Sequence, residues 1–100
     1  MKIEMNIVTS GNGTNRDKIT DCQVYIAIVT PNFVSNDKCL GEMKDAQALK
    51  KEMFALVDKL TCLPSYFFYL DWRLVLFYSN KAEFEIASEF LKKNLEDLEN

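Results

Sequence analysis

The sequence predicts an α/β fold in which a parallel sheet of about four strands is flanked by helices. Apolar and β-branched side chains dominate residues 23–30, 52–58 and 71–79, with polar residues mainly at the ends of each run. Runs of this length are typical of strands buried on both faces, as in a parallel sheet. Segments with helical periodicity lie between and after these runs, and such alternation indicates βαβ units.

The composition indicates one globular domain over residues 1–100. The net charge argues against a nucleic-acid partner. Apolar residues make up 48% of the chain, which is enough for one packed core. The net charge is −3 and the Lys and Arg residues are dispersed, whereas a nucleic-acid partner selects a basic face. We find no run of about 18 apolar residues for a membrane span, and the N-terminus does not resemble a signal peptide. We therefore expect a cytoplasmic protein.

Two strands and a short helical turn are expected in the first part of the chain. Residues 2–8 alternate and then become apolar, which predicts a strand, and 9–15 hold two of the three glycines, which predicts a loop. A helical turn fits 15–21. The strand over 23–30 ends at Pro31, because proline cannot donate to a sheet.

A helix and a strand are expected next. The period of 37–50 is helical, and Ser35, Asn36 or Asp37 is expected to cap its start. The run 52–58 predicts a buried strand.

The last part of the chain predicts a strand and a long amphipathic helix. The aromatic run 66–70 has no clear secondary structure, and we expect part of it to make a homodimer contact. The strand 71–79 precedes a helix over 80–98, whose start resembles a capping box formed by Asn80 and Glu83. One face of this helix is apolar, with Ile86 and Phe90 beside it: Phe84, Ala87, Leu91, Leu95 and Leu98.

The chemistry open to this chain is limited by its composition. There is no histidine, which excludes Ser-His-Asp and Cys-His catalysis and any His-ligated metal. The three cysteines are scattered, and we expect reduced thiols, no metal site and no resident cofactor. Ligands of parallel sheets bind beyond the carboxyl ends of the strands, where the sequence places Thr9-Ser10-Gly11 and Thr30-Pro31-Asn32.

Glu42 is the residue that fits its segment least well. On a helical wheel of 37–50, Cys39, Met43, Ala46 and Leu49 share one arc and Glu42 falls inside it, as does Lys50 near the helix end. Glu42 is then expected to overhang a crevice, partly desolvated and with a raised pKa. The alternative is a carboxylate that simply reaches water, and periodicity alone favours that alternative.

The segment around Glu42 resembles Toll/interleukin-1 receptor-type (TIR) domains. CQVYIAIVTPNFVSNDKCLGEMKDA matches their hydrophobic strand ending in Ser or Thr, then Pro-Asn-Phe/Tyr, Ser, Cys, Glu, an apolar residue and Ala. Lys38 stands where the family usually has tryptophan. The resemblance runs over about residues 20–98 and implies a three-layer, flavodoxin-like or TIR-like sheet. Nucleoside deoxyribosyltransferases are similar in outline, and also carry a catalytic Glu before a pattern like Ala46-Gln-Ala-Leu49.

The resemblance implies two functions of different classes. In the catalytic branch of the family the matching glutamate is essential for cleaving the nicotinamide–ribose bond of NAD, so Glu42 becomes the catalytic carboxylate and NAD a substrate. We predict that the nucleotide is held by Ser10, Gly11, Thr30, Asn32 and Phe33. The alternative is a non-catalytic interaction or nucleotide-sensing module that self-associates. Only 22 residues precede the strand at 23–30, so one strand–helix unit of the family is expected to be absent, which favours the alternative.

Overall fold

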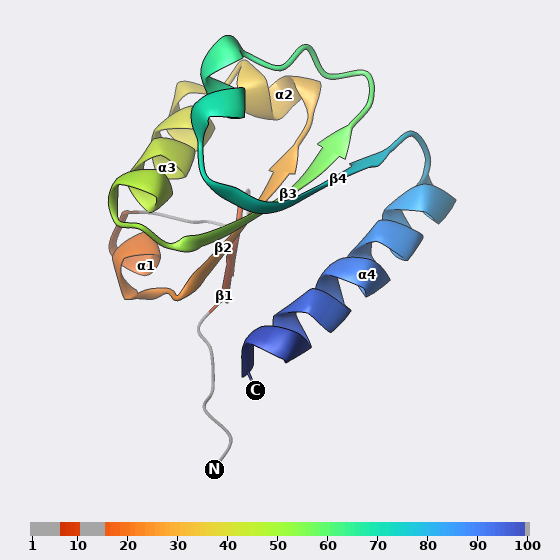
Figure 1. Cartoon of the computed structure of the whole chain (residues 1–100). Coiled ribbons are helices and arrows are strands. Elements are labelled where there is room, and N and C mark those ends of the chain that lie inside the picture. The colour runs from red at the N-terminus through yellow and green to blue at the C-terminus, as the bar shows by residue number, and fades with distance from the viewer. Residues whose placement is uncertain (1–6, 11–15, 100) are drawn as a thin grey trace.

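The computed structural model describes residues 7–10 and 16–99 (Figure 1). The elements, in chain order, are β1 (Ile7–Thr9), α1 (Arg16–Asp21), β2 (Val24–Val29), α2 (Pro31–Val34), α3 (Asp37–Ala48), β3 (Glu52–Asp58), the 3₁₀ helix η1 (Ser65–Tyr69), β4 (Trp72–Tyr78) and α4 (Lys81–Glu99). The strands and helices predicted from residue 15 onward are present, and α2 and η1 are additional. The prediction that 71–79 is buried on both faces is wrong, because β4 is only partly buried and pairs with β3 alone among the described strands. The predicted strand 2–8 lies outside the described residues except for its last two positions.

The four described strands form one parallel sheet in the order β1-β2-β3-β4. The predicted α/β class and three-layer arrangement are confirmed. Figure 1 shows α1 and α3 on one side of the sheet and α4 on the other. The helices that connect successive strands share a face because strands added in sequence order at one edge, with crossovers of one hand, keep their helices together.

Strands β2 and β3 send alternate side chains into two separate cores. Tyr25, Ala27 and Val29 pack with α1, α2 and α3, whereas Val24 and Ile26 pack on the side of α4. The same alternation in β3 assigns Met53, Ala55 and Val57 to the first core and Phe54 and Leu56 to the second. Period-two alternation with both faces apolar explains why the sequence shows continuous apolar runs.

Side chains cap the helices that follow β2. The Asn36 Oδ1 accepts hydrogen bonds from the backbone N–H groups of Lys38 and Cys39, at 2.9 and 3.3 Å, so Asn36 is the cap among the three candidates. Thr30 caps α2 in the same way, since its Oγ1 accepts from the Phe33 N–H at 3.2 Å. Pro31 occupies the first position of α2, where its missing N–H has no intrahelical partner to lose. Proline therefore begins a helix here as well as ending a strand.

The start of α4 is held by Asn80 and Glu83. The Asn80 Oδ1 accepts from the Glu83 N–H at 2.9 Å, as in a capping box. The Glu83 carboxylate reaches back to Ser79, accepting from its backbone N–H at 2.9 Å and from its hydroxyl. The predicted pair is present, with the return bond made one residue earlier than in the standard motif.

Two expectations at the end of α3 are wrong. The helix ends at Ala48, so Leu49 is its C-cap and is 40% exposed instead of lying in the apolar arc. Lys50 does not continue the helix, because its φ is 57°. A left-handed residue directly after the C-cap is a common way to end a helix, and glycine is the residue best suited to it.

The aromatic run divides between core and surface. Phe67 is buried against Trp72, with their ring centroids 4.8 Å apart, and the Trp72 Nε1–H donates to the Phe67 carbonyl at 2.9 Å. Phe68 and Tyr69 are exposed. The homodimer contact expected from this run stays a prediction.

The cysteines and the helices have two further features. Cys22, Cys39 and Cys62 are unpaired. Among residues 7–10 and 16–99, none of the helices is both long enough and apolar enough to cross a bilayer.

We expect the replacement Lys50→Gly to raise the free energy of unfolding by about 1 kcal/mol, because glycine removes the left-handed penalty of a residue with a Cβ. Urea titration followed by circular dichroism measures this. The control is Ala48→Gly at the last helical position, which we expect to lower stability by up to about 1 kcal/mol. Equal losses in both variants would contradict a left-handed conformation at residue 50.

Candidate functional site

A shallow depression lies at the carboxyl ends of β1 and β2. Its volume is about 290 Å³. The lining residues come from the end of β1, from the end of β2, and from α2 and the start of α3: Ser10, Ile28, Thr30, Asn32, Phe33, Asn36 and Cys39. Four of the five residues predicted to hold a nucleotide line it, and the fifth, Gly11, is outside the described residues.

Ser10 is fixed in position by the sheet. Its backbone N–H donates to the Ile26 carbonyl at 2.9 Å, which extends the β1–β2 ladder by one residue. Its Oγ accepts from the Ile28 N–H at 2.8 Å. The residue is only 7% exposed. The Ser10 oxygen accepts this hydrogen bond, and the O–H group of the same side chain can donate another.

The segment 30–36, which contains α2, supplies the side-chain amides and the aromatic ring of the site. Phe33 is buried and anchors α2 to the first core, while Asn32 beside it is exposed at the rim. The side-chain oxygens of Thr30 and Asn36 already accept hydrogen bonds, because each of these residues caps a helix. Asn32 is therefore the lining residue whose amide is presented most directly to solvent.

Glu42 lies behind this depression and does not line it in the described part of the chain. It follows Cys39 by three residues on α3, so it sits on the same side of the helix, about one turn further from the strand ends. The residue is 7% exposed. Burial raises the pKa of its carboxyl, Lys38 lowers it and Asp45 raises it further. The expected desolvation and raised pKa are present. The expected overhang of a crevice is not found in the described part of the chain, and the alternative that periodicity favours, a carboxylate that simply reaches water, does not fit the low exposure of Glu42.

Tyr25 and Cys39 lie within the electrostatic reach of Glu42. Burial, and then the charge of Glu42, raise the pKa values of both the Tyr25 phenol and the Cys39 thiol. Cys39 is therefore a thiol at neutral pH, not an activated thiolate. The Tyr25 hydroxyl is close to Ser10, yet within the described residues it has no hydrogen-bond partner of good geometry.

The described wall of the depression contains no charged side chain. Hydroxyls, carboxamides, a thiol and a ring form it. Such a wall suits a polyhydroxyl or amide-bearing group better than a bare phosphate, which prefers Arg, Lys or several N–H donors. No group of three His, Cys, Asp or Glu side chains with metal-ligand geometry occurs among the residues that the structure describes.

Sequence reasoning missed Tyr25 and Asn36 as neighbours of the site. A tyrosine in the otherwise aliphatic strand VYIAIV is a usable signal, because a phenol in a buried strand needs a partner. Asn36 was recognised only as one of three possible caps. Its place in the wall depends on the tight α2–α3 connection, which the sequence did not predict.

The comparisons with known proteins add no relative. No family model, curated protein or solved structure matches the chain. The resemblance around Glu42 therefore stays a prediction from the sequence motif alone.

We expect Glu42→Gln to be more stable than the parent at neutral pH, with an advantage that disappears as the pH falls. A buried carboxyl whose pKa is raised takes up its proton in the folded state at a higher pH than in the unfolded state. The free energy of unfolding of the parent therefore rises as the pH falls. The gain is complete below about pH 4.5, where Glu42 is protonated in the folded and the unfolded state.

Urea titrations of both proteins between neutral pH and about pH 4 measure this difference. A difference that grows on acidification, or a Glu42 carboxyl that titrates below its ordinary pKa by NMR, would contradict the burial of Glu42.

Proposed function

We propose that this chain is a TIR-like module that binds a nucleotide through its ribose and amide groups in the depression at the carboxyl ends of β1 and β2. The observation that carries the proposal is that Ser10 lies in one depression with Thr30, Asn32 and Phe33, which follow it by some twenty residues in the sequence. Its uncharged, hydrogen-bonding wall matches the hydroxyls of a ribose and the carboxamide of a nicotinamide ring.

NAD is the first ligand to test, because the resemblance implies it and because it carries both groups. We place the ligand's sugar against Ser10 and Asn32, with Phe33 as the apolar floor. A cytoplasmic location would give access to NAD.

We expect Asn32→Ala to weaken NAD binding about tenfold, the loss that follows from removing one or two hydrogen bonds. Titration calorimetry, together with amide shifts in NMR spectra, measures it. The matched control is Asn94→Ala on α4, an equal chemical change at a residue whose Nδ2 donates to the Phe90 carbonyl of its own helix. Equal affinities of the two variants, or no NAD binding by the parent, would overturn the proposed site.

A second candidate function, NAD glycohydrolase activity, is supported by the buried carboxyl of Glu42. A carboxylate beside the reacting sugar stabilises the oxocarbenium-like charge that develops when an N-glycosidic bond breaks. Glu42 has the low exposure and raised pKa typical of such groups. For it to act, the side chain has to move from behind Cys39 into the depression, or a second copy has to complete the pocket.

If the chain is an enzyme, we expect nicotinamide release from NAD that is lost in Glu42→Gln and Glu42→Ala. The parent's rate then falls on the acid side with an apparent pKa above the ordinary glutamate value, since the ionised form is the active one. Gly41→Ala is the control, because a Cβ at residue 41 meets no atom within 4 Å. NAD binding without release at high protein concentration would leave the binding module as the function and remove Glu42 from the chemistry.

A further inference from the structure

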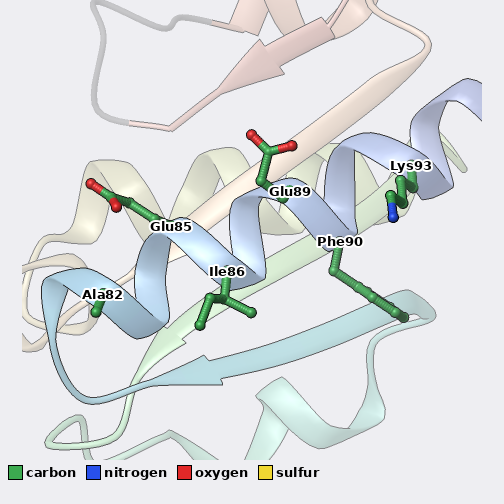
Figure 2. Close-up of a pocket in the computed structure, with 6 residues that line it drawn as sticks. All are labelled: Ala82, Glu85, Ile86, Glu89, Phe90 and Lys93. Carbon is green, nitrogen blue, oxygen red and sulfur yellow. The ribbon is translucent and has the colours of Figure 1, made fainter.

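The outer face of α4 is a second unpartnered surface, on the side of the sheet away from α1 and α3. The α4 surface consists of Ala82, Ile86 and Phe90, bordered by Glu85, Glu89 and Lys93. Ile86 is 71% exposed and Phe90 is 52% exposed. Figure 2 shows Ile86 and Phe90 extending from one side of the helix, and Glu85 and Glu89 extending from the other.

This surface continues onto the edge of the sheet. A second hollow of about 320 Å³ shares Ile86 and Phe90 with the first and is lined by Leu76 and Phe77 of β4. Phe77 is 51% exposed. Among the described strands, β4 pairs with β3 alone, so its outer backbone is available for contact. Large apolar side chains along a helix and an open sheet edge indicate an interaction site.

We propose that the α4 surface is where two copies of this chain pair, with their α4 helices antiparallel about a two-fold axis near Phe90. This proposal does not depend on the proposed function. In that arrangement the two Phe90 rings meet at the axis. The partner's Lys93 then lies opposite residue 87, within about 3 Å along the axis of both Glu85 and Glu89.

The charges of the surface favour this occupant and this direction. Each copy contributes two carboxylates and one ammonium group, and the ammonium group of one copy lies between the two carboxylates of the other along the helix, so both halves of the contact are attractive. Parallel helices would place Glu85 against Glu85 and Lys93 against Lys93. An anionic membrane surface is disfavoured as occupant, because two of the three charged residues bordering the apolar stripe are acidic.

The size of the surface sets the expected strength of pairing. One helix pair extended by a sheet edge is smaller than a standard interface of about 800 Å² per partner. We therefore expect a dimer that dissociates in the micromolar range, measured for the full chain by sedimentation velocity over a concentration series.

The first test is Phe90→Asp, which we expect to raise the dimer dissociation constant at least about tenfold, as loss of a central aromatic anchor does. Phe90 is exposed, so the fold tolerates the change, and a thermal melt verifies this. The comparison variant is Phe68→Ser, an exposed aromatic on η1, which separates this surface from the aromatic run 66–70. Pairing through α4 leaves the dimer unchanged in this variant, whereas pairing through the aromatic run weakens it. A parent that is monomeric throughout, or a dimer lost in Phe68→Ser and kept in Phe90→Asp, would overturn the proposal.

The second test exchanges charges and reports the direction of the helices. Lys93→Glu alone and Glu85→Lys/Glu89→Lys alone are both expected to be monomeric, because each places like charges in both halves of the contact. An equimolar mixture of the two is expected to dimerise to within about threefold of the parent, since every pair is again opposite in sign. A mixture that stays monomeric would overturn the antiparallel arrangement.

Discussion

The structure depends on the pairing of β2 with β3 in the interior of the sheet. These strands run in register from Val24 opposite Glu52 to Val29 opposite Val57, and nearly all of their side chains are buried. Each face of the pair therefore needs its own cover, which α1 to α3 supply on one face and α4 on the other. A shift of register by one residue would exchange the two sets of side chains between cores of different shape.

The same pairing creates the depression at the carboxyl ends. In a parallel sheet all strand ends meet at one edge, so the turns after β1 and β2 are neighbours although they are distant in sequence. Ser10 joins the two strands through its backbone and its hydroxyl. Tyr25 packs in the first core with its phenol close to Ser10, and the charge of Glu42 on α3 acts on that phenol. Apart from Ser10, the residues of this neutral wall and the carboxyl behind it all come from the contiguous segment 22–46, and packing adds Ser10 to them.

The α4 face is a consequence of covering a sheet with a single described helix. Ala87 and Leu91 are buried against β3 and β4, which turns Ile86 and Phe90 outward along the sheet edge. The resulting surface is on the opposite face of the sheet from α3 and its residue Glu42. Pairing through α4 would therefore leave the depression accessible, and would hold two such sites at fixed positions in one assembly.

The sequence alone determined the α/β class, the positions of the three long strands and both long helices, because local periodicity dictates these features. It also located the unusual Glu42. It did not reveal that β4 is only partly buried. Nor did it reveal that Glu42 lies behind the depression, that Tyr25 shares its environment, or that α3 stops before Leu49 and Lys50. Those outcomes were decided by the tertiary structure, since which side of a helix is covered, and how far a buried side chain reaches, depend on neighbours that are remote in the chain.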